Sequence, residues 1–150
     1  MTLEVIVETD PRNQLREGLA LIEPVMEAEG FEWRQGAFGN GSGGPFASGE
    51  YVRGDRRLEL HFRYSLGMVT YHIGNLALSH EQFMRHTGHR LEAKYPGFSK
   101  DPIHAFRDLA EDLSRFGGDF LKGNGAEFRA AHTASNEYEK QSGFHRLGKQ

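Results

Sequence analysis

Cysteine is absent from this chain of 150 residues, which excludes disulfide bonds, thiolate metal ligands and a cysteine nucleophile. Apolar runs are short, and none approaches the roughly 18 residues that a membrane-spanning helix requires. The N-terminus, MTLEVIVETD, carries acids where a secretory signal peptide has a basic segment followed by an apolar core. These absences predict a soluble cytoplasmic protein, and a chain of this length can bury the core of one domain without disulfides.

A surplus of positive charge is also missing. The formal net charge is −3 and the isoelectric point is near 6.2. General binding to nucleic acid depends on Lys and Arg side chains that neutralise phosphates, so this charge balance argues against it. We therefore expect neither a nucleic-acid partner nor a membrane partner.

Three segments carry signals for the start of a helix. Asp10 and Asp101 are each followed by proline, which is typical of an N-cap residue and the first helical position. Ser79 and Gln82 match a capping box. Apolar residues follow each start at helical spacing, most regularly over residues 103–120. The sequence predicts helices beginning near residues 11, 80 and 102, with a kink or break of the first at Pro24.

The clearest strand signal lies between Gly49 and Gly74, where apolar and polar residues alternate. A period of two is typical of a strand with one buried side and one solvent-facing side. The apolar side is predicted to hold Leu58, Leu60, Phe62 and Tyr64, and the polar side Arg57, Glu59, His61 and Arg63.

The neighbours of this strand follow from its two turns. A turn at residues 54–55 places Glu50 opposite Glu59 and Ser48 opposite His61. Directly opposed residues share a face of the sheet. The first hairpin therefore brings two carboxylates together on the polar side.

A two-residue loop at residues 66–67 is predicted for the second hairpin. It places His61 opposite His72 and Arg63 opposite Thr70, and it matches the apolar residues of both strands on the other face. The two histidines would then lie close enough to share a proton, a water molecule or a metal ion.

The order of elements is helix, strands, helices, which predicts an α+β fold. We expect an antiparallel sheet of three or four strands, with helices packed on one face and the polar face open. Residues 1–122 are predicted to form the domain. Residues 123–150 are predicted to be a C-terminal extension, a short helix and a tail, docked on the domain or on another subunit. Weak alternation at Leu3 to Glu8 indicates a short strand or an extended lead-in, and Phe31 to Ala37 is read as a further strand.

The segment from Gly39 to Gly44 is rich in glycine. It lacks the Gly-Lys-Ser/Thr ending and the following helix of a phosphate-binding P-loop. We interpret it as a connection between two antiparallel strands, and its role beyond that stays open.

Two interpretations of the polar face remain. In the first, Glu59, His61 and His72, with Glu50 beside them, form an acid–base site or bind a divalent metal such as zinc, manganese or iron. In the second, the face is an ordinary polar surface or one that a partner covers. Its binding residues would then be Glu50, Arg57, Arg63 and Thr70.

Most of the chain resembles a family of small bacterial proteins of unknown function. The resemblance rests on GPFASGEYVRGDRRLELHFRYSLGMVTYHIG, on HEQFM and on YPGFSKDPIHAF. In size, acidity and α+β make-up the chain is also similar to the immunity proteins of bacterial toxin systems. The family resemblance implies no activity and assigns no functional residues.

Two classes of function follow. The first is a non-enzymatic binding or regulatory protein, immunity-like, whose open polar sheet face contacts a protein partner or a second copy of the chain, with no cofactor. The acidic balance, the tyrosine and arginine content and the lack of a complete catalytic motif favour this class. The second is a metal-dependent or acid–base enzyme with its site on Glu50, Glu59, His61 and His72.

Overall fold

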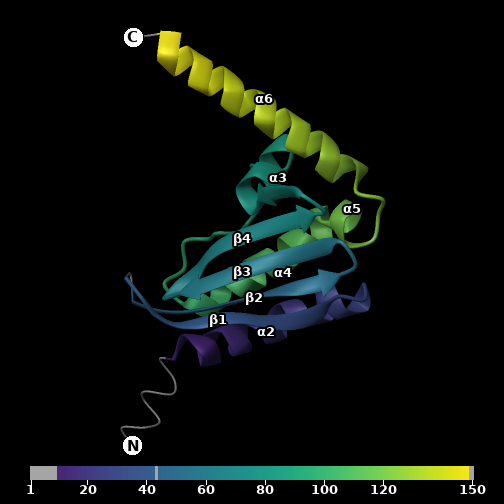
Figure 1. Ribbon diagram of the computed structural model, residues 1–150. Coiled ribbons are helices and arrows are strands. Elements are labelled where there is room, and N and C mark those ends of the chain that lie inside the picture. Colours follow the sequence, from purple (N-terminus) through teal and green to yellow (C-terminus); the bar gives the residue numbers. More distant parts are fainter. Residues whose placement is uncertain (1–9, 43, 149–150) are drawn as a thin grey trace, which may run out of the picture.

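The computed structural model describes residues 10–42 and 44–148 and contains a five-stranded antiparallel sheet (Figure 1). The strands lie side by side in the order in which they follow one another along the chain. Their bounds are β1, Glu32–Gly41; β2, Gly44–Arg53; β3, Arg56–Arg63; β4, Ser65–Ile73; and β5, Leu76–Ser79. The predicted α+β class and antiparallel sheet are confirmed, with one strand more than expected.

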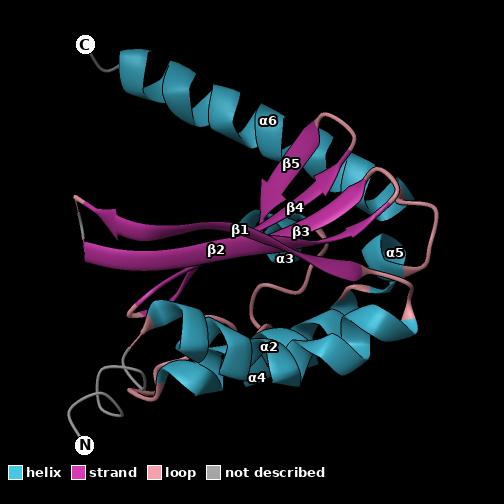
Figure 2. Cartoon of the chain, turned by 60° about the horizontal axis from the view of Figure 1, so that its bottom comes forward, coloured by secondary structure: helices cyan, strands magenta, loops and turns pink. Residues whose placement is uncertain are grey.

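Helices precede and follow the sheet. Their bounds are α2, Pro11–Ala28; α3, His80–His86; α4, Pro102–Phe116; α5, Gly118–Leu121; and α6, Ala126–Gly148. Figure 2 shows α2 and α4 side by side beneath one face of the sheet. In Figure 1 the strands pass in front of α4, and no helix lies in front of β1 to β4. The opposite face of the sheet is therefore open.

The three predicted helix starts are confirmed. Asp10 and Asp101 cap α2 and α4 with their carboxylates, and Ser79 forms the capping box of α3 with Gln82. α2 continues through Pro24, where a kink or break was expected. Pro24 is exposed, so the carbonyl that loses its intrahelical partner lies on the solvent side of the helix.

The core lies between the sheet and the α2–α4 layer. Leu58, Leu60 and Phe62 of β3 are fully buried, as the alternation predicts. The two helices approach closely at Gly18, where an added Cβ would lie 2.3 Å from the ring of Phe106. A side chain at this position of α2 would collide with a ring that the sheet holds in place.

The predicted register of the first hairpin is confirmed, and that of the second is wrong. Glu50 lies opposite Glu59 and Ser48 opposite His61. His61, however, lies opposite Met68, and His72 lies opposite Arg57.

A turn at a single residue explains the second register. Tyr64 has a φ of 63° and joins Arg63 directly to Ser65, its partner across the turn. Leu66, which was predicted to lie in the loop, is instead part of β4 and lies opposite Phe62. It is only 3% exposed, so the single-residue turn allows this leucine to be buried in the core. Arg63 therefore does not face Thr70, which lies opposite Glu59. His61 and Glu59 are moved four positions along β4, whereas Phe62 and Arg63 are moved five, because a bulge lies between His61 and Phe62. The bulge keeps the polar residues on both sides of it on one face.

The C-terminal segment is one 23-residue helix, α6, instead of a short helix and a tail. Phe128 and Ala131, in its first turns, belong to the same core as the sheet. Phe128 packs edge-on against Phe83 of α3. Figure 1 shows α6 passing α3 at the β5 end of the sheet and projecting beyond it. The predicted segment from Leu3 to Glu8 lies outside the described residues.

Candidate binding face of the sheet

The open face of the sheet carries a patch that we call the polar sheet face. One row of this patch crosses all five strands, with each residue directly opposite the next. The row consists of Arg34, Glu50, Glu59, Thr70 and Ser79. The other members of the polar sheet face are Ser48, Arg57, His61, Arg63 and His72.

Ion pairs run both across and diagonally between neighbouring strands on this face. The Arg57 guanidinium donates to Glu50 at 3.0 Å, and Arg34 lies 4.0 Å from the other oxygen of that carboxylate. Glu50 is thus neutralised by two arginines although it lies opposite Glu59. Its side chain is 21% exposed, which makes it the better shielded of the two carboxylates.

Glu59 has a different partner. Nε2 of His72 lies 2.9 Å from its carboxylate, and the Glu59 side chain is 49% exposed. The two histidines that the sequence placed together are separated by the corrected register. His61 instead stacks on Phe46, with ring centroids 5.5 Å apart and planes 5° from parallel. Only His72 of the two is bonded to a carboxylate.

The predicted metal ligands are consequently not gathered at one point. Among the side chains that the structure describes, those of residues 10–42 and 44–142, no group of three His, Cys, Asp or Glu lies close enough to hold a metal ion. A shallow hollow of about 230 Å³ lies beside the carboxylates, where the bulge of β1 meets β2 and β3. Arg34, Gly36 and Ser48 contribute to its lining, together with Glu50 and Glu59.

The end of the polar sheet face near the Tyr64 turn is aromatic and apolar. The Arg63 guanidinium lies over the Phe46 ring at 5.6 Å. Tyr64 and Met68 are 69% and 60% exposed. Large side chains of this kind are enriched in the centres of protein interfaces. The turn that breaks the predicted register is also what turns Tyr64 out of the core.

A second group of hydrogen-bonded polar side chains, which the sequence did not reveal, lies in the core. The Tyr71 hydroxyl is 2.8 Å from Nδ1 of His80, and Nε2 of His80 is 2.9 Å from the Asp112 carboxylate. An ionised carboxylate can only accept. The geometry therefore fits Nε2–H of His80 donating to Asp112, with Nδ1 hydrogen-bonded to the Tyr71 hydroxyl.

Asp112 also binds the loop between α3 and α4. It accepts backbone N–H bonds from Lys94 and Tyr95 at 2.8 to 3.0 Å. Burial raises the pKa of Asp112, but the bonds from His80 and from these amides outweigh burial and hold its pKa below the ordinary value of 3.8. Burial, with the Asp112 charge second, raises the pKa of Tyr71 well above its ordinary value.

This buried group stabilises the fold and is closed to solvent. His80 is 3% exposed, and Tyr71 and Asp112 are 0% exposed. The only signal for it in the sequence is the capping box, which places His80 at the first position of α3, directly after the strand that contains buried Leu78. Nothing in the spacing of the sequence indicates that Asp112 reaches it.

Searches against protein-family models, curated proteins and solved structures give no match for this chain. Functional inference therefore rests on the geometry of the polar sheet face. Within the described ranges no helix is long and apolar enough to cross a membrane.

Proposed function

We propose that this chain is a non-enzymatic binding or regulatory protein, immunity-like, that presents its polar sheet face to a protein partner. The observation that carries the proposal is that helices cover one face of the sheet and leave the other face uncovered. α2 and α4 pack beneath one face, while no described helix covers the other (Figures 1 and 2). That open face is the polar sheet face, which carries Arg34, Arg57 and Arg63. A sheet face that no helix covers is a natural surface for another protein.

The chemistry of the face supports binding in preference to catalysis. Its two opposed carboxylates are each engaged, Glu50 by Arg57 and Glu59 by His72. Because these ion pairs hold charges of both signs in fixed positions, a partner with a complementary charge pattern would bind more specifically and associate faster. The exposed ring of Tyr64 and the Met68 side chain add apolar area at one end, where a partner can gain affinity by burial.

An acid–base or metal-dependent enzyme is the second candidate. The hydrogen bond between His72 and the half-exposed Glu59 favours it, because such a pair can accept and return a proton. Metal analysis of protein purified without an affinity tag, repeated on His72→Ala, separates the candidates. If the wild type contains stoichiometric metal and His72→Ala does not, the result would favour the enzyme. A metal-free protein would remove the metal-dependent form of this candidate.

Met68→Asp is expected to weaken partner binding by about tenfold or more, because it replaces exposed apolar area with a charge in the apolar part of the interface. The measurement is recovery of the partner with each variant from extracts of the source cell. Leu91→Asp is the matched control, since Leu91 is 97% exposed and lies in the loop after α3. Equal recovery with both variants would contradict the proposal, provided that both melt at the wild-type temperature.

A further inference from the structure

The exposed flank of α2 carries charges in an unusual order. Four residues form what we call the α2 charge stripe, with both cations before both anions: Arg12, Arg16, Glu23 and Glu27. Their spacings of four, seven and four place them on one side of a helix with about 3.6 residues per turn. All four are exposed, and Leu19 and Ala20 lie at the centre of the stripe.

This order is unfavourable in an isolated helix. The first turn of α2 has no acid and the last turn has no base, so the stripe opposes the helix dipole. Like charges four residues apart also repel. A hydrogen bond to Glu23, with the repulsion between the two carboxylates second, raises the pKa of Glu27. The chain therefore keeps a charge pattern that its own helix disfavours.

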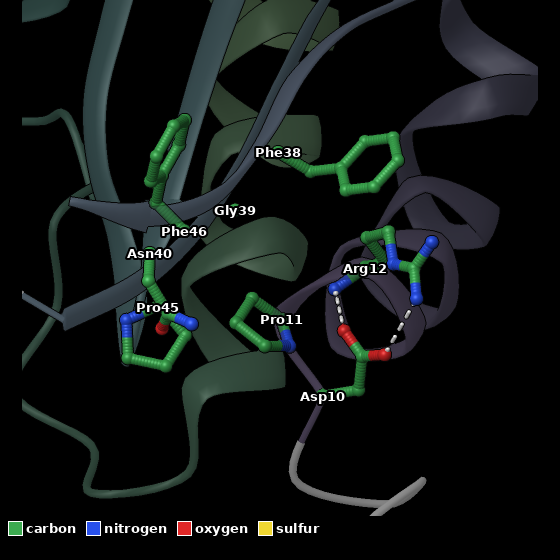
Figure 3. Close-up of a pocket in the computed structure, with 8 residues that line it drawn as sticks. All are labelled: Asp10, Pro11, Arg12, Phe38, Gly39, Asn40, Pro45 and Phe46. Atoms are coloured by element: carbon green, nitrogen blue, oxygen red, sulfur yellow. Dashed lines mark hydrogen bonds and ion pairs between the residues drawn. The ribbon is translucent and has the colours of Figure 1, made fainter.

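The stripe borders an apolar groove at the edge of the sheet. Two adjoining hollows of about 370 and 310 Å³ lie between the N-terminal half of α2 and β1, and both are lined by Arg12 and Phe38. Figure 3 shows the Phe38 ring next to Arg12, whose guanidinium lies 4.4 Å from the ring centroid. Phe38 is 53% exposed. Leu19 and Trp33 line the second hollow.

The outer edge of β1 lies beside this groove. In the part of the chain that the structure describes, β1 pairs with β2 alone and ends the sheet. A free strand edge offers backbone N–H and C=O groups to another strand. An apolar groove and an unpaired strand edge therefore lie on the same flank as the charge stripe.

We propose that the α2 charge stripe, the groove and the β1 edge form the interface of a homodimer with two-fold symmetry. Each cation of the stripe has an anion at the same distance on the other side of the midpoint between Leu19 and Ala20. Two antiparallel copies of α2 therefore match it completely: Arg12 meets Glu27 of the second copy, and Arg16 meets Glu23 of the second copy. A two-fold axis requires self-complementarity of this kind.

The interface lies mostly on the other side of the sheet from the proposed binding face; Phe46, which lines the first hollow and stacks on His61, lies where the two meet. α2 lies beneath the sheet, on the side opposite the polar sheet face (Figure 2). The dimer would hold two copies of that face, both free for partners. This inference does not depend on the proposed function, and either can fail without the other.

A charge swap tests the pairing. Arg16 is a better position to change than Arg12. The Arg16 guanidinium donates to the neutral side chain of Asn13, whereas the Arg12 guanidinium forms an ion pair with Asp10 at 3.2 Å. A change at Arg16 therefore leaves that ion pair intact. Sedimentation equilibrium of the wild type is expected to give twice the chain mass of 16.9 kDa. Arg16→Glu and Glu23→Arg are each expected to raise the dimer Kd about tenfold or more, since each places like charges opposite one another twice.

The double variant Arg16→Glu/Glu23→Arg is expected to restore the wild-type Kd to within about threefold, since it reverses both members of each pair. Glu17→Arg is the matched control, with the same charge change at an exposed position outside the stripe, and should leave the Kd unchanged. If a reversal impairs folding by circular dichroism, Arg16→Gln and Glu23→Gln replace it. A wild-type monomer at about 0.5 mM, or a double variant that stays dissociated, would overturn the proposal.

Discussion

Asp112→Ala is expected to lower the free energy of unfolding by about 3–5 kcal/mol, because it leaves several shielded hydrogen-bond donors without an acceptor, at about 1–3 kcal/mol each. The variant leaves Nε2–H of His80 and the amides of Lys94 and Tyr95 without the fully buried carboxylate that accepts from them. It also opens a cavity at the centre of α4. Chemical denaturation followed by circular dichroism measures the loss.

The matched control is the neighbouring acid on the same helix. Glu111 binds the Lys94 side chain at 2.9 Å, but both side chains are about half-exposed. An exposed ion pair contributes at most about 1 kcal/mol, so Glu111→Ala should have a small effect. If Asp112→Ala costs no more than Glu111→Ala, the buried group does not stabilise the fold as described.

Acid is expected to remove the same contribution. The pKa of Asp112 is lower in the folded chain than its ordinary value of 3.8. A lowered pKa contributes stability that is fully present above the unfolded value and is lost as the pH falls through the folded value. The wild type should therefore lose stability below about pH 4 more steeply than Asp112→Ala does. Unfolding curves of the two proteins between pH 6 and pH 2 give this comparison.

Phe120→Ala is also expected to cost about 3–5 kcal/mol, as large aromatic truncations in cores do. The ring is fully buried, stacks on Phe31 at 5.7 Å and meets Tyr71 edge-on at 5.0 Å and Phe128 at 6.2 Å. It thus joins the sheet, the end of α2 and the start of α6.

Phe98→Ala is the control, because the same side chain at residue 98 is fully exposed. Its truncation should change stability by less than about 0.5 kcal/mol. Amide exchange offers a second measurement. In Phe120→Ala the first turns of α6 should lose protection before β3 does, since Phe128 loses one of its ring contacts. Equal stabilities of the two variants would contradict this picture of the core.

The sequence predicted those parts of the fold that depend on local signals. The alternation of β3 identified its buried side, because a strand with one solvent-facing side must alternate. The caps of α2, α3 and α4 marked their starts, because Asp10, Ser79 and Asp101 satisfy amides within their own first turns.

Features that depend on the three-dimensional context were missed. Tyr64 adopts a left-handed conformation that sequence rules reserve for glycine or asparagine, so the second hairpin was predicted with the wrong turn. β5 was also missed, although Gly74 and Asn75 form a recognised hairpin signal before it. Its four residues are too few for a clear alternation.

The candidate site shows the same division. The residues of β2, β3 and β4 on the polar sheet face were predicted as one face, because up to the bulge the register differs by four positions, an even number. The residue that lies opposite each of them across β3 and β4 was predicted wrongly, because the pairing of two strands depends on the turn between them. Arg34 and Ser79, at the two ends of the row, were not predicted to belong to the polar sheet face. The contact between His80 and Asp112 joins residues 32 positions apart, and only the tertiary fold, in which α3 and α4 both pack against β4, brings them together.

Site-specific photo-crosslinking tests the central claim most directly. A benzophenone amino acid at Thr70, in the middle of the polar sheet face, is compared with one at Ser114, an exposed position of α4 in the helical layer. We expect Thr70 to give a discrete adduct with one protein other than the chain itself, displaced by excess unlabelled protein, and Ser114 to give none. No adduct from Thr70, or the same adduct from both positions, would contradict the assignment of the polar sheet face as the binding surface.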